Sequence, residues 1–337
     1  MALDVRNQTK KSPLTDRFGR RHTYLRVSVT DRCNLRCQYC MPAEGIPWIP
    51  RQEILTYEEI ERIVGVLAGA GVEKVRITGG EPTVRKGITD LIAGIARTKG
   101  IKDLAMTTNG TTLAKMAQAY GDAGLTQVNV SIDSLQEEKY KEITRTDKLQ
   151  TVLDGLDAAV DAGFGTIKVN VVAMKGVNED EIPAFVELAK RKGINVRFIE
   201  FMPFDGNEWT KDRMLTYREM RAVVERHAKV TPIERAPSQV AKDFRIDGSE
   251  GTVSFITSMT EDFCSDCNRL RLTATGEFKP CLFMLPNVSV RDIIRDGGSD
   301  DDILEAVHGS LEKKWVGHPS PQELIRLKNS SMVQIGG

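Results

Sequence analysis

The six cysteines of this 337-residue chain fall into two groups of three that lie far apart in the sequence. The first group has the spacing C-x3-C-x2-C and comprises Cys33, Cys37 and Cys40. The second group begins as C-x2-C and comprises Cys264, Cys267 and Cys281. Three thiolates can hold three of the four irons of a 4Fe–4S cubane, which leaves one iron open to a substrate or cofactor. The two triplets therefore predict two open 4Fe–4S clusters.

Other uses of cysteine fit this pattern less well. Buried structural cysteines are small hydrophobes that scatter along a chain, and disulfides would leave an odd thiol in each group. Tetrahedral zinc needs four ligands. The four histidines lie at no zinc-finger spacing from either triplet: His22, His227, His308 and His318. The spacing thus favours iron–sulfur chemistry.

Basic residues inside apolar, β-branched runs form a second chemically distinctive set. Lys74 and Arg76 are two apart, as are Arg269 and Arg271, so each pair points to one side of its strand. One such residue alone usually pairs with a surface carboxylate, but seven in a neutral chain require more compensation. A bound triphosphate would supply it, because arginine forks suit phosphate oxygens. The set is Arg26, Lys74, Arg76, Lys168, Arg197, Arg269 and Arg271.

Composition gives no separate indication of a polyanionic partner. Lys+Arg and Asp+Glu number 47 each, and 40% hydrophobic with 28% charged residues is typical of a globular protein. The first 22 residues lack the apolar run of a signal peptide, and no stretch approaches the ~20 apolar residues of a membrane span. These features predict a cytoplasmic protein without nucleic-acid or membrane partners. No P-loop, GxGxxG fingerprint or nucleophile elbow is present.

The elements that must position these residues alternate between strands and helices. Six β-branched runs predict strands over 24–30, 74–78, 103–108, 127–133, 166–174 and 195–202. Amphipathic patterns between them predict helices over 57–71, 88–97, 112–123, 150–162 and 179–191. Six β/α units are too few for a closed eight-stranded barrel. The fold class expected is therefore α/β, a partial (β/α)6 TIM-like barrel.

After Met202 the alternation ends. A helix over 216–227, a polar loop over 231–251 and short strands near the second cysteine group predict a smaller C-terminal α+β domain that closes the open side. The expected division is an N-terminal extension over 1–22, the barrel over 23–245 and the C-terminal domain over 246–337.

The predicted strands end in polar or flexible residues, which parallel β/α folds gather at one face. The ends include TGGEP (78–82), TTNG (107–110), Ser131 with Asp133, and Glu200 with Met202. The Gly79–Gly80 pair lacks Cβ atoms, so we expect its backbone to approach a ligand closely.

The first triplet, with Tyr39 between its last two cysteines, resembles the signature of radical S-adenosylmethionine (SAM) enzymes, and TGGEP resembles their GGE motif. Together with VRITGGEPTVR, FCSDCNRLRLT and the terminal glycine pair, the chain is similar to the GTP 3′,8-cyclase (MoaA) family of molybdenum-cofactor biosynthesis from about Arg17 to Gly337.

This resemblance implies a lyase that cyclises GTP to (8S)-3′,8-cyclo-7,8-dihydroguanosine 5′-triphosphate. The first cluster would cleave S-adenosyl-L-methionine, and the 5′-deoxyadenosyl radical would take the 3′ hydrogen of GTP before C3′ attacks guanine C8. It implies that the cofactor is lined by Tyr39, Gly80, Ser131 and Met202.

The second cluster would bind guanine. The resemblance implies that the triphosphate and ribose are held by Arg26, Lys74, Arg76, Thr107, Lys168, Arg197, Arg269 and Arg271. It also implies catalytic roles for Arg269, Arg271, Gly336 and Gly337, the last two as a mobile tail.

The resemblance further implies partners: an electron donor such as flavodoxin or ferredoxin, a second copy in a homodimer, and the next enzyme, cyclic pyranopterin monophosphate synthase, which would take the product. Two alternatives stay open. One is a peptide-modifying radical SAM enzyme with an auxiliary cluster, and the other is an electron-transfer or metal-binding module without turnover.

Overall fold

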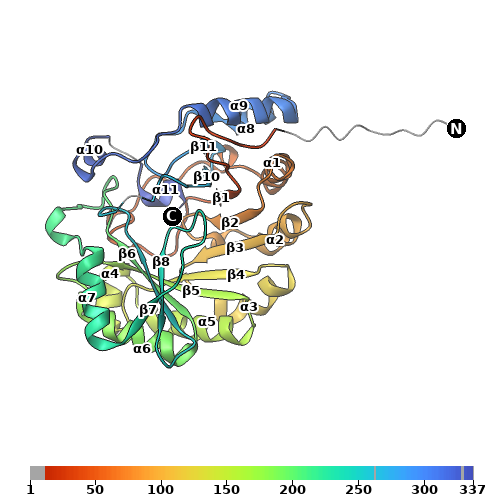
Figure 1. Ribbon diagram of the computed structural model, residues 1–337. Coiled ribbons are helices and arrows are strands. Elements are labelled where there is room, and N and C mark those ends of the chain that lie inside the picture. Colours follow the sequence, from red (N-terminus) through yellow and green to blue (C-terminus); the bar gives the residue numbers. More distant parts are fainter. Residues whose placement is uncertain (1–11, 262, 328–329, 337) are drawn as a thin grey trace.

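The structure, a computed structural model, describes residues 12–261, 263–327 and 330–336. Within them, twelve strands form one sheet in the order β12-β11-β10-β1-β2-β3-β4-β5-β6-β9-β8-β7 (Figure 1). Its centre is parallel and follows the chain: β1 (Tyr24–Ser28), β2 (Lys74–Thr78), β3 (Asp103–Thr108), β4 (Gln127–Ser131), β5 (Thr166–Ala173) and β6 (Asn195–Glu200). The predicted six-unit parallel barrel is confirmed.

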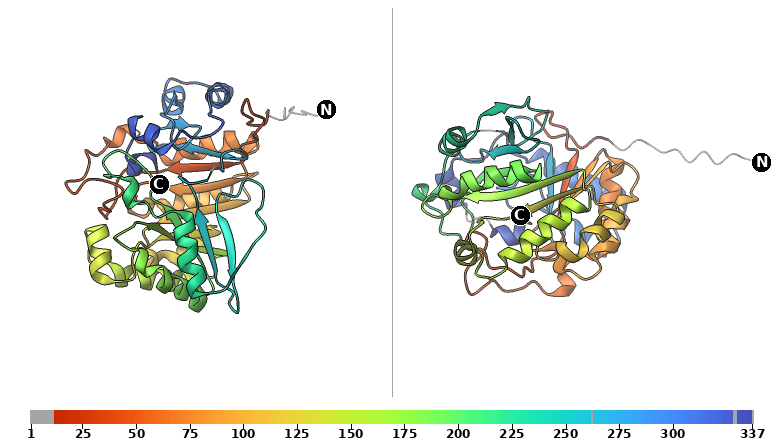
Figure 2. Two further views of the ribbon diagram at one scale, coloured as in Figure 1. Left: turned by 60° about the vertical axis from the view of Figure 1, so that its left-hand side comes forward. Right: turned by 90° about the horizontal axis from the view of Figure 1, so that it is seen from below.

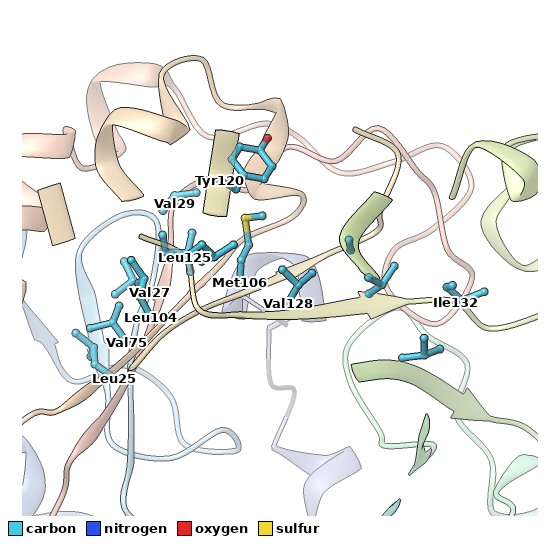
Figure 3. Close-up of a cluster of buried hydrophobic side chains, with 14 of the residues drawn as sticks. Leu25, Val27, Val29, Val75, Leu104, Met106, Tyr120, Leu125, Val128 and Ile132 are labelled. Carbon is cyan, nitrogen blue, oxygen red and sulfur yellow. The ribbon is translucent and has the colours of Figure 1, made fainter. Parts of the chain in front are cut away.

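Helices cover the outer face of these strands. They are α1 (Tyr57–Gly69), α2 (Ile88–Ala96), α3 (Leu113–Asp122), α4 (Glu137–Thr144), α5 (Leu149–Asp161), α6 (Ile182–Lys192) and α7 (Tyr217–His227). The outward side chains of the strands, such as Leu25, Val75 and Val128, are fully buried in the layer between strands and helices (Figure 3). Because side chains alternate along a strand, the polar residues between them face the barrel interior.

The last third of the chain extends this sheet at both edges. Its strands are β7 (Val230–Pro232), β8 (Lys242–Ile246), β9 (Thr252–Ile256), β10 (Arg269–Leu272), β11 (Glu277–Lys279) and β12 (Val288–Ser289). β9 pairs in parallel with β6, whereas β10 pairs in parallel with β1 at the opposite edge. Residues 257–261 and 263–268 therefore cross the open side of the barrel, and they carry Cys264 and Cys267 of the second triplet.

Two sequence predictions in this region and the barrel were incomplete. The stretch 231–251 was expected to be a loop, but it contains most of a β7–β8 hairpin in which Phe244 and Ile246 are buried. The helix α4 was not expected, because its sequence EEKYKEIT is strongly polar. The expected domain boundary after residue 245 falls within β8, and the division into domains stays a proposal.

Four helices complete the chain: α8 (Val290–Arg295), α9 (Asp300–Glu312), α10 (Pro321–Arg326) and α11 (Met332–Ile335). The helices α8 and α9 lie together at one end of the molecule, whereas α11 lies near its middle (Figures 1 and 2). Val333 and Ile335 of α11 are buried. None of the described helices is long and apolar enough to span a membrane.

Candidate active site

A cavity of about 320 Å³ lies inside the partial barrel. Its walls come from the strand interiors, the loop after β1 and the segment that crosses the open side. All six cysteines line it: Cys33, Cys37, Cys40, Cys264, Cys267 and Cys281. The structure therefore brings the two triplets, which are far apart in the sequence, to one cavity.

The first triplet lies on the loop that follows β1, and α4 fixes that loop. The backbone N–H groups of Arg36 and Gln38 donate to the last-turn carbonyls of Thr144 and Ile143, at 3.0 and 2.9 Å. Arg145, which ends α4 in the left-handed conformation, donates from Nη1 to the carbonyl of Arg36 at 2.7 Å. The helix that the sequence did not predict is thus the support of the cysteine loop.

The GGE segment also holds this loop, and its glycines have a packing role in addition to the ligand contact predicted for them. A Cβ on Gly80 would lie 2.4 Å from the carbonyl oxygen of Arg32, and one on Gly79 would lie 2.8 Å from that of Thr30. The Gly80 N–H donates to the Thr30 carbonyl at 2.6 Å. The glycines permit close packing of two backbones, and Gly80 also lines the cavity.

Glu81, the acidic residue of this motif, is 1% exposed and acts as a hub of hydrogen bonds. Its carboxylate accepts from the Asn109 N–H at 2.6 Å and from the hydroxyls of Thr83 and Thr108, each at 2.7 Å. Burial is the largest influence and raises the pKa of Glu81 despite these donors. The carboxylate ties the ends of β2 and β3 together beside the cysteine loop.

Tyr39 is held by Asp133, which follows β4. Its hydroxyl donates to Asp133 Oδ2 at 2.8 Å, and the other oxygen of Asp133 accepts from the Val172 N–H at 2.8 Å. Burial raises the pKa of Asp133 to about 6. The expected cofactor residues Tyr39, Gly80, Ser131 and Met202 all line the cavity.

Arginines line the cavity on both sides of the opening in the barrel. Five of the expected substrate cations contribute: Arg26, Arg76, Arg197, Arg269 and Arg271. Thr107 lines the cavity too, whereas Lys74 and Lys168 do not. Burial, and then the nearby charge of Arg197, lower the pKa of Lys168 to about 8. Lys74 instead donates to Gln127 at 3.0 Å.

The cations lie close enough to destabilise one another. Burial and then Arg26 and Arg269 lower the pKa of Arg271 well below its ordinary range. Burial and then Arg76 lower that of Arg197 to about 10. Although burial raises the pKa of Tyr24, the charges of Arg76 and Arg26 outweigh it, and that pKa falls to about 7. A strongly positive enclosed space results, which suits a polyanion.

Several buried polar atoms around the cavity lack a hydrogen-bond partner within the part of the chain that the structure describes. They are Arg197 Nε, Arg271 Nη1, Asn129 Oδ1 and Asn170 Oδ1. Unsatisfied buried donors and acceptors are costly, so a ligand that supplies the missing partners would bind favourably. The mixture of donors and acceptors fits a nucleotide with phosphate and hydroxyl or base groups.

The two triplets differ in electrostatics. Burial raises the pKa of Cys33 to about 11 and that of Cys40 to about 12. At Cys267 burial acts in the same direction, but Arg269 and Lys314 outweigh it and lower the pKa to about 7. Arg269 also lies over the Phe263 ring, 5.2 Å from its centroid. Cys267 is therefore predisposed to the thiolate form that metals require.

The donor sets fit iron–sulfur clusters. Over residues 12–261, 263–327 and 330–336, no three His, Cys, Asp or Glu side chains converge closely enough to hold a single metal ion. The ligands of a cubane bind separate irons and lie farther apart than those of one ion. The three thiols of each triplet match the number of protein ligands of an open cubane.

The chain end also reaches the barrel. Met332 lines the cavity, and Gly336 adopts a φ of +83° with its Cα against β1 and β2. A Cβ there would lie 2.6 Å from Ser28 Cβ and 2.9 Å from Thr78 Oγ1. Gly337 lies outside the described residues.

Sequence reasoning did not select several residues that line the cavity. They include Tyr24, Asn129, Asn170, Phe283 and His318. Period-two alternation could have found three of them, because Tyr24, Asn129 and Asn170 lie two positions from Arg26, Ser131 and Lys168. Phe283 and His318, whose ring centroids are 5.1 Å apart, come from segments without regular structure and gave no such signal.

Comparisons with known proteins agree with this arrangement. Residues 27–189 match the Radical SAM superfamily, and residues 194–319 match Molybdenum Cofactor Synthesis C. GTP 3′,8-cyclase, mitochondrial, of Arabidopsis thaliana is 47% identical over 98% of this chain and 86% of the relative. GTP 3′,8-cyclase of Rhodopirellula baltica is 44% identical over 98% and 94%. Molybdenum cofactor biosynthesis protein 1 of Homo sapiens is 42% identical over 96%, but the chain spans about half (51%) of its length.

Among solved structures, Streptococcus suis SuiB bound to its precursor peptide SuiA is similar to this chain. The TM-score is 0.59 at 16% identity, over 87% of this chain and 67% of SuiB. At that identity the likeness shows the fold alone.

Proposed function

Because this chain belongs to the GTP 3′,8-cyclase family of radical SAM enzymes, we propose that it cyclises GTP to (8S)-3′,8-cyclo-7,8-dihydroguanosine 5′-triphosphate, in the first step of molybdenum-cofactor biosynthesis. One observation carries the proposal: both cysteine triplets and five arginines line one cavity. A binding module without turnover would not require such a positively charged space.

The first triplet would hold the 4Fe–4S cluster that binds SAM, and Tyr39, Gly80, Ser131 and Met202 would line the cofactor. SAM supplies, when bound at a reduced cluster, a carbon radical that can abstract hydrogen. Asp133 keeps Tyr39 in place through its 2.8 Å hydrogen bond. The walls of the cavity would limit the access of water and other hydrogen donors to the space where the radical would act.

The second triplet would hold the other cluster, whose open iron would take the guanine. The phosphates would meet the cations of the cavity, with Arg269 and Arg271 nearest that triplet in sequence. A triphosphate would supply the negative charge that these buried arginines lack. Lys168 and Lys74, which do not line the cavity, would contribute to its positive electrostatic potential without touching the phosphates.

Four further features are proposed from the family relationship. Flavodoxin or ferredoxin would reduce the first cluster, and the enzyme would act as a homodimer in the cytoplasm. The product would pass to cyclic pyranopterin monophosphate synthase. The Gly336–Gly337 tail would reach into the site during turnover.

Anaerobic turnover tests the proposal. Reconstituted protein should carry about eight irons per chain, and with SAM, GTP and a reductant it should form 5′-deoxyadenosine together with the cyclised nucleotide. Formation of 5′-deoxyadenosine without loss of GTP would favour a peptide-modifying enzyme. Absence of 5′-deoxyadenosine would favour an electron-transfer module, and four irons with zinc would refute two clusters.

A further inference from the structure

A buried lysine lies behind the second triplet, outside the cavity lining. Lys314 follows α9 and is 2% exposed. Its Nζ lies 3.0 Å from the carbonyl oxygen of Arg269, 3.8 Å from Cys267 Sγ and 3.4 Å from His22 Nδ1. An ammonium has three N–H groups, and these three acceptors account for all of them.

The charge of Lys314 has no carboxylate partner within 4.0 Å among the described residues. The nearby carboxylate of Asp16 is already engaged. Its Oδ2 accepts from Arg20 Nε at 2.7 Å and lies 3.1 Å from His22 Nε2. A buried ammonium without a counter-ion is strongly unfavourable. The thiolate of Cys267 is the anion in contact with it.

His22 fixes the direction of the donor. The ring is fully buried, and burial followed by the Lys314 charge lowers its pKa to about 4, so it is neutral near pH 7. Its Nε2–H donates to Asp16, which leaves Nδ1 as the acceptor for Lys314. The chain Asp16–His22–Lys314–Cys267 is therefore consistently polarised, from the carboxylate to the sulfur.

Arg20 anchors the same region of the backbone. Its guanidinium donates to the carbonyl oxygens of Cys264, Trp315 and Val316 at 2.7, 2.6 and 2.8 Å. It thus joins the crossing segment that carries the cysteines to the segment that carries Lys314. The position of the ammonium relative to Cys267 is set by this scaffold and not by a flexible side chain alone.

The inference rests on the proposed function, in which the second triplet holds a 4Fe–4S cluster. We propose that Lys314 is a positioning residue of that cluster. Its ammonium donates to the Cys267 thiolate and favours the reduced cluster. Reduction adds negative charge to the cluster and its sulfurs. A hydrogen bond and a fixed positive charge at one sulfur stabilise that state and raise the reduction potential.

The test compares reconstituted full-length proteins by redox titration with EPR detection. Lys314→Met removes the charge and keeps the length of the side chain. Lys314→Arg keeps the charge, and Lys313→Met removes a neighbouring exposed lysine as the matched control. A parallel sample of Cys37→Ser, which lacks a ligand of the first cluster, assigns the signals of the two clusters.

We expect a more negative potential for the second cluster in Lys314→Met, a value close to wild type in Lys314→Arg and no change in Lys313→Met. An unchanged potential in fully loaded Lys314→Met would overturn the proposal. If Lys314→Met fails to load the second cluster, loading of Lys314→Arg would support the role of the charge. Failure of both to load would indicate packing instead and would also overturn it.

Failure of this proposal can be distinguished from failure of the proposed function. Wild-type protein that carries four irons, or that leaves GTP unchanged, would refute the cyclase whatever the variants show. A wild-type enzyme with about eight irons and an unaltered potential in loaded Lys314→Met would refute only the role of the lysine.

Discussion

Arg271 combines deep burial with a crowded set of like charges. It is 6% exposed, one of its terminal nitrogens has no partner among the described residues, and Arg26 and Arg269 lie near it. Without a bound ligand such a buried charge destabilises the fold. When an anionic ligand is bound, the same charge contributes to the binding affinity. Stability and binding should therefore respond in opposite directions when the charge is removed.

We predict that Arg271→Leu stabilises the ligand-free protein by roughly 1–4 kcal/mol, because apolar replacement of buried charges is often stabilising. It should weaken GTP binding by roughly 10–100-fold, since charge-assisted hydrogen bonds contribute about 1.5–3 kcal/mol. Urea unfolding without nucleotide and calorimetric titration with GTP measure the two effects.

Arg221→Leu is the control for this prediction. Arg221 is 40% exposed and pairs with Glu225 at 2.7 Å on the surface of α7. Its removal should change stability by less than about 1 kcal/mol and leave GTP binding unaltered. A destabilised Arg271→Leu protein that binds GTP normally would contradict the assignment of the anion site.

Single residues also show where sequence reasoning succeeds. Cysteine spacing and cations at alternate strand positions pointed to residues that share one cavity, because spacing and burial cost are local properties. The packing role of Gly80 was not predicted, since its neighbour is the backbone of Arg32, 48 positions away in the chain. No local pattern contains that contact.

Among the elements, α11 places Gly336, the last described residue, against the ends of β1 and β2. Val333 and Ile335 are buried, and Gly336 closes the helix in the left-handed conformation against Ser28 and Thr78. The sequence alone indicated only a terminal tail. Its docking depends on a conformation that side chains other than glycine adopt at a cost.

We predict that Gly336→Ala lowers turnover while the iron content stays at the wild-type value. The added Cβ would lie 2.6 Å from Ser28 Cβ and would displace the tail from the barrel. Iron analysis and the anaerobic turnover assay distinguish the two properties.

Gly309→Ala in α9 is the matched control, because no atom lies within 4 Å of the added methyl group. This change should stabilise the helix by roughly 0.5–1 kcal/mol and leave turnover unchanged. Equal turnover in Gly336→Ala and wild type would show that the docked tail has no part in the reaction.

Elements with alternating or β-branched sequence were predictable, and those stabilised mainly by tertiary contacts were not. The run KVRIT gave β2 with its observed ends. The polar helix α4 has few buried residues of its own and is positioned by its contacts with the cysteine loop. Its support of that loop could be seen only in three dimensions.

At the scale of the whole molecule, the network around Asp16 joins three distant parts of the chain. Arg20 and His22 belong to the N-terminal segment, Cys264 to the crossing segment and Lys314 to the segment after α9. The titration of His22 therefore reports on the integrity of the entire assembly. Its charged neighbours are Lys314, Asp16 and Arg20.

We predict that stability falls in acid because of His22. Its pKa is about 4 in the folded protein against an ordinary value of 6.5, so between these values the unfolded chain binds a proton that the folded one does not. Above pH 6.5 both forms are neutral and the full stability is present. As the pH decreases to 4, the free energy of unfolding should decrease by about 3 kcal/mol through this group.

Urea unfolding of wild type and His22→Gln at equal metal loading, from pH 7 to pH 4, measures this contribution. The free energy of unfolding of wild type, taken relative to that of His22→Gln, should decrease as the pH falls over that interval, because glutamine does not titrate. Parallel curves would show that His22 has no depressed pKa in the folded protein.

The placement of β9 and β10 could not have been predicted from the sequence. Only twelve residues separate them, yet they pair with β6 and β1 at opposite edges of the sheet. A short connection normally indicates neighbouring strands. The two edges that β9 and β10 join lie on either side of the open side of the barrel.

This connection has a consequence for biosynthesis of the protein on the ribosome. β1 is made early, but its partner along one edge, β10, emerges only after most of the chain has been translated. The nascent polypeptide therefore presents an unpaired strand edge, which is prone to association with other chains. Cys281 is translated later still, so complete assembly of the second metal centre must await the final part of synthesis.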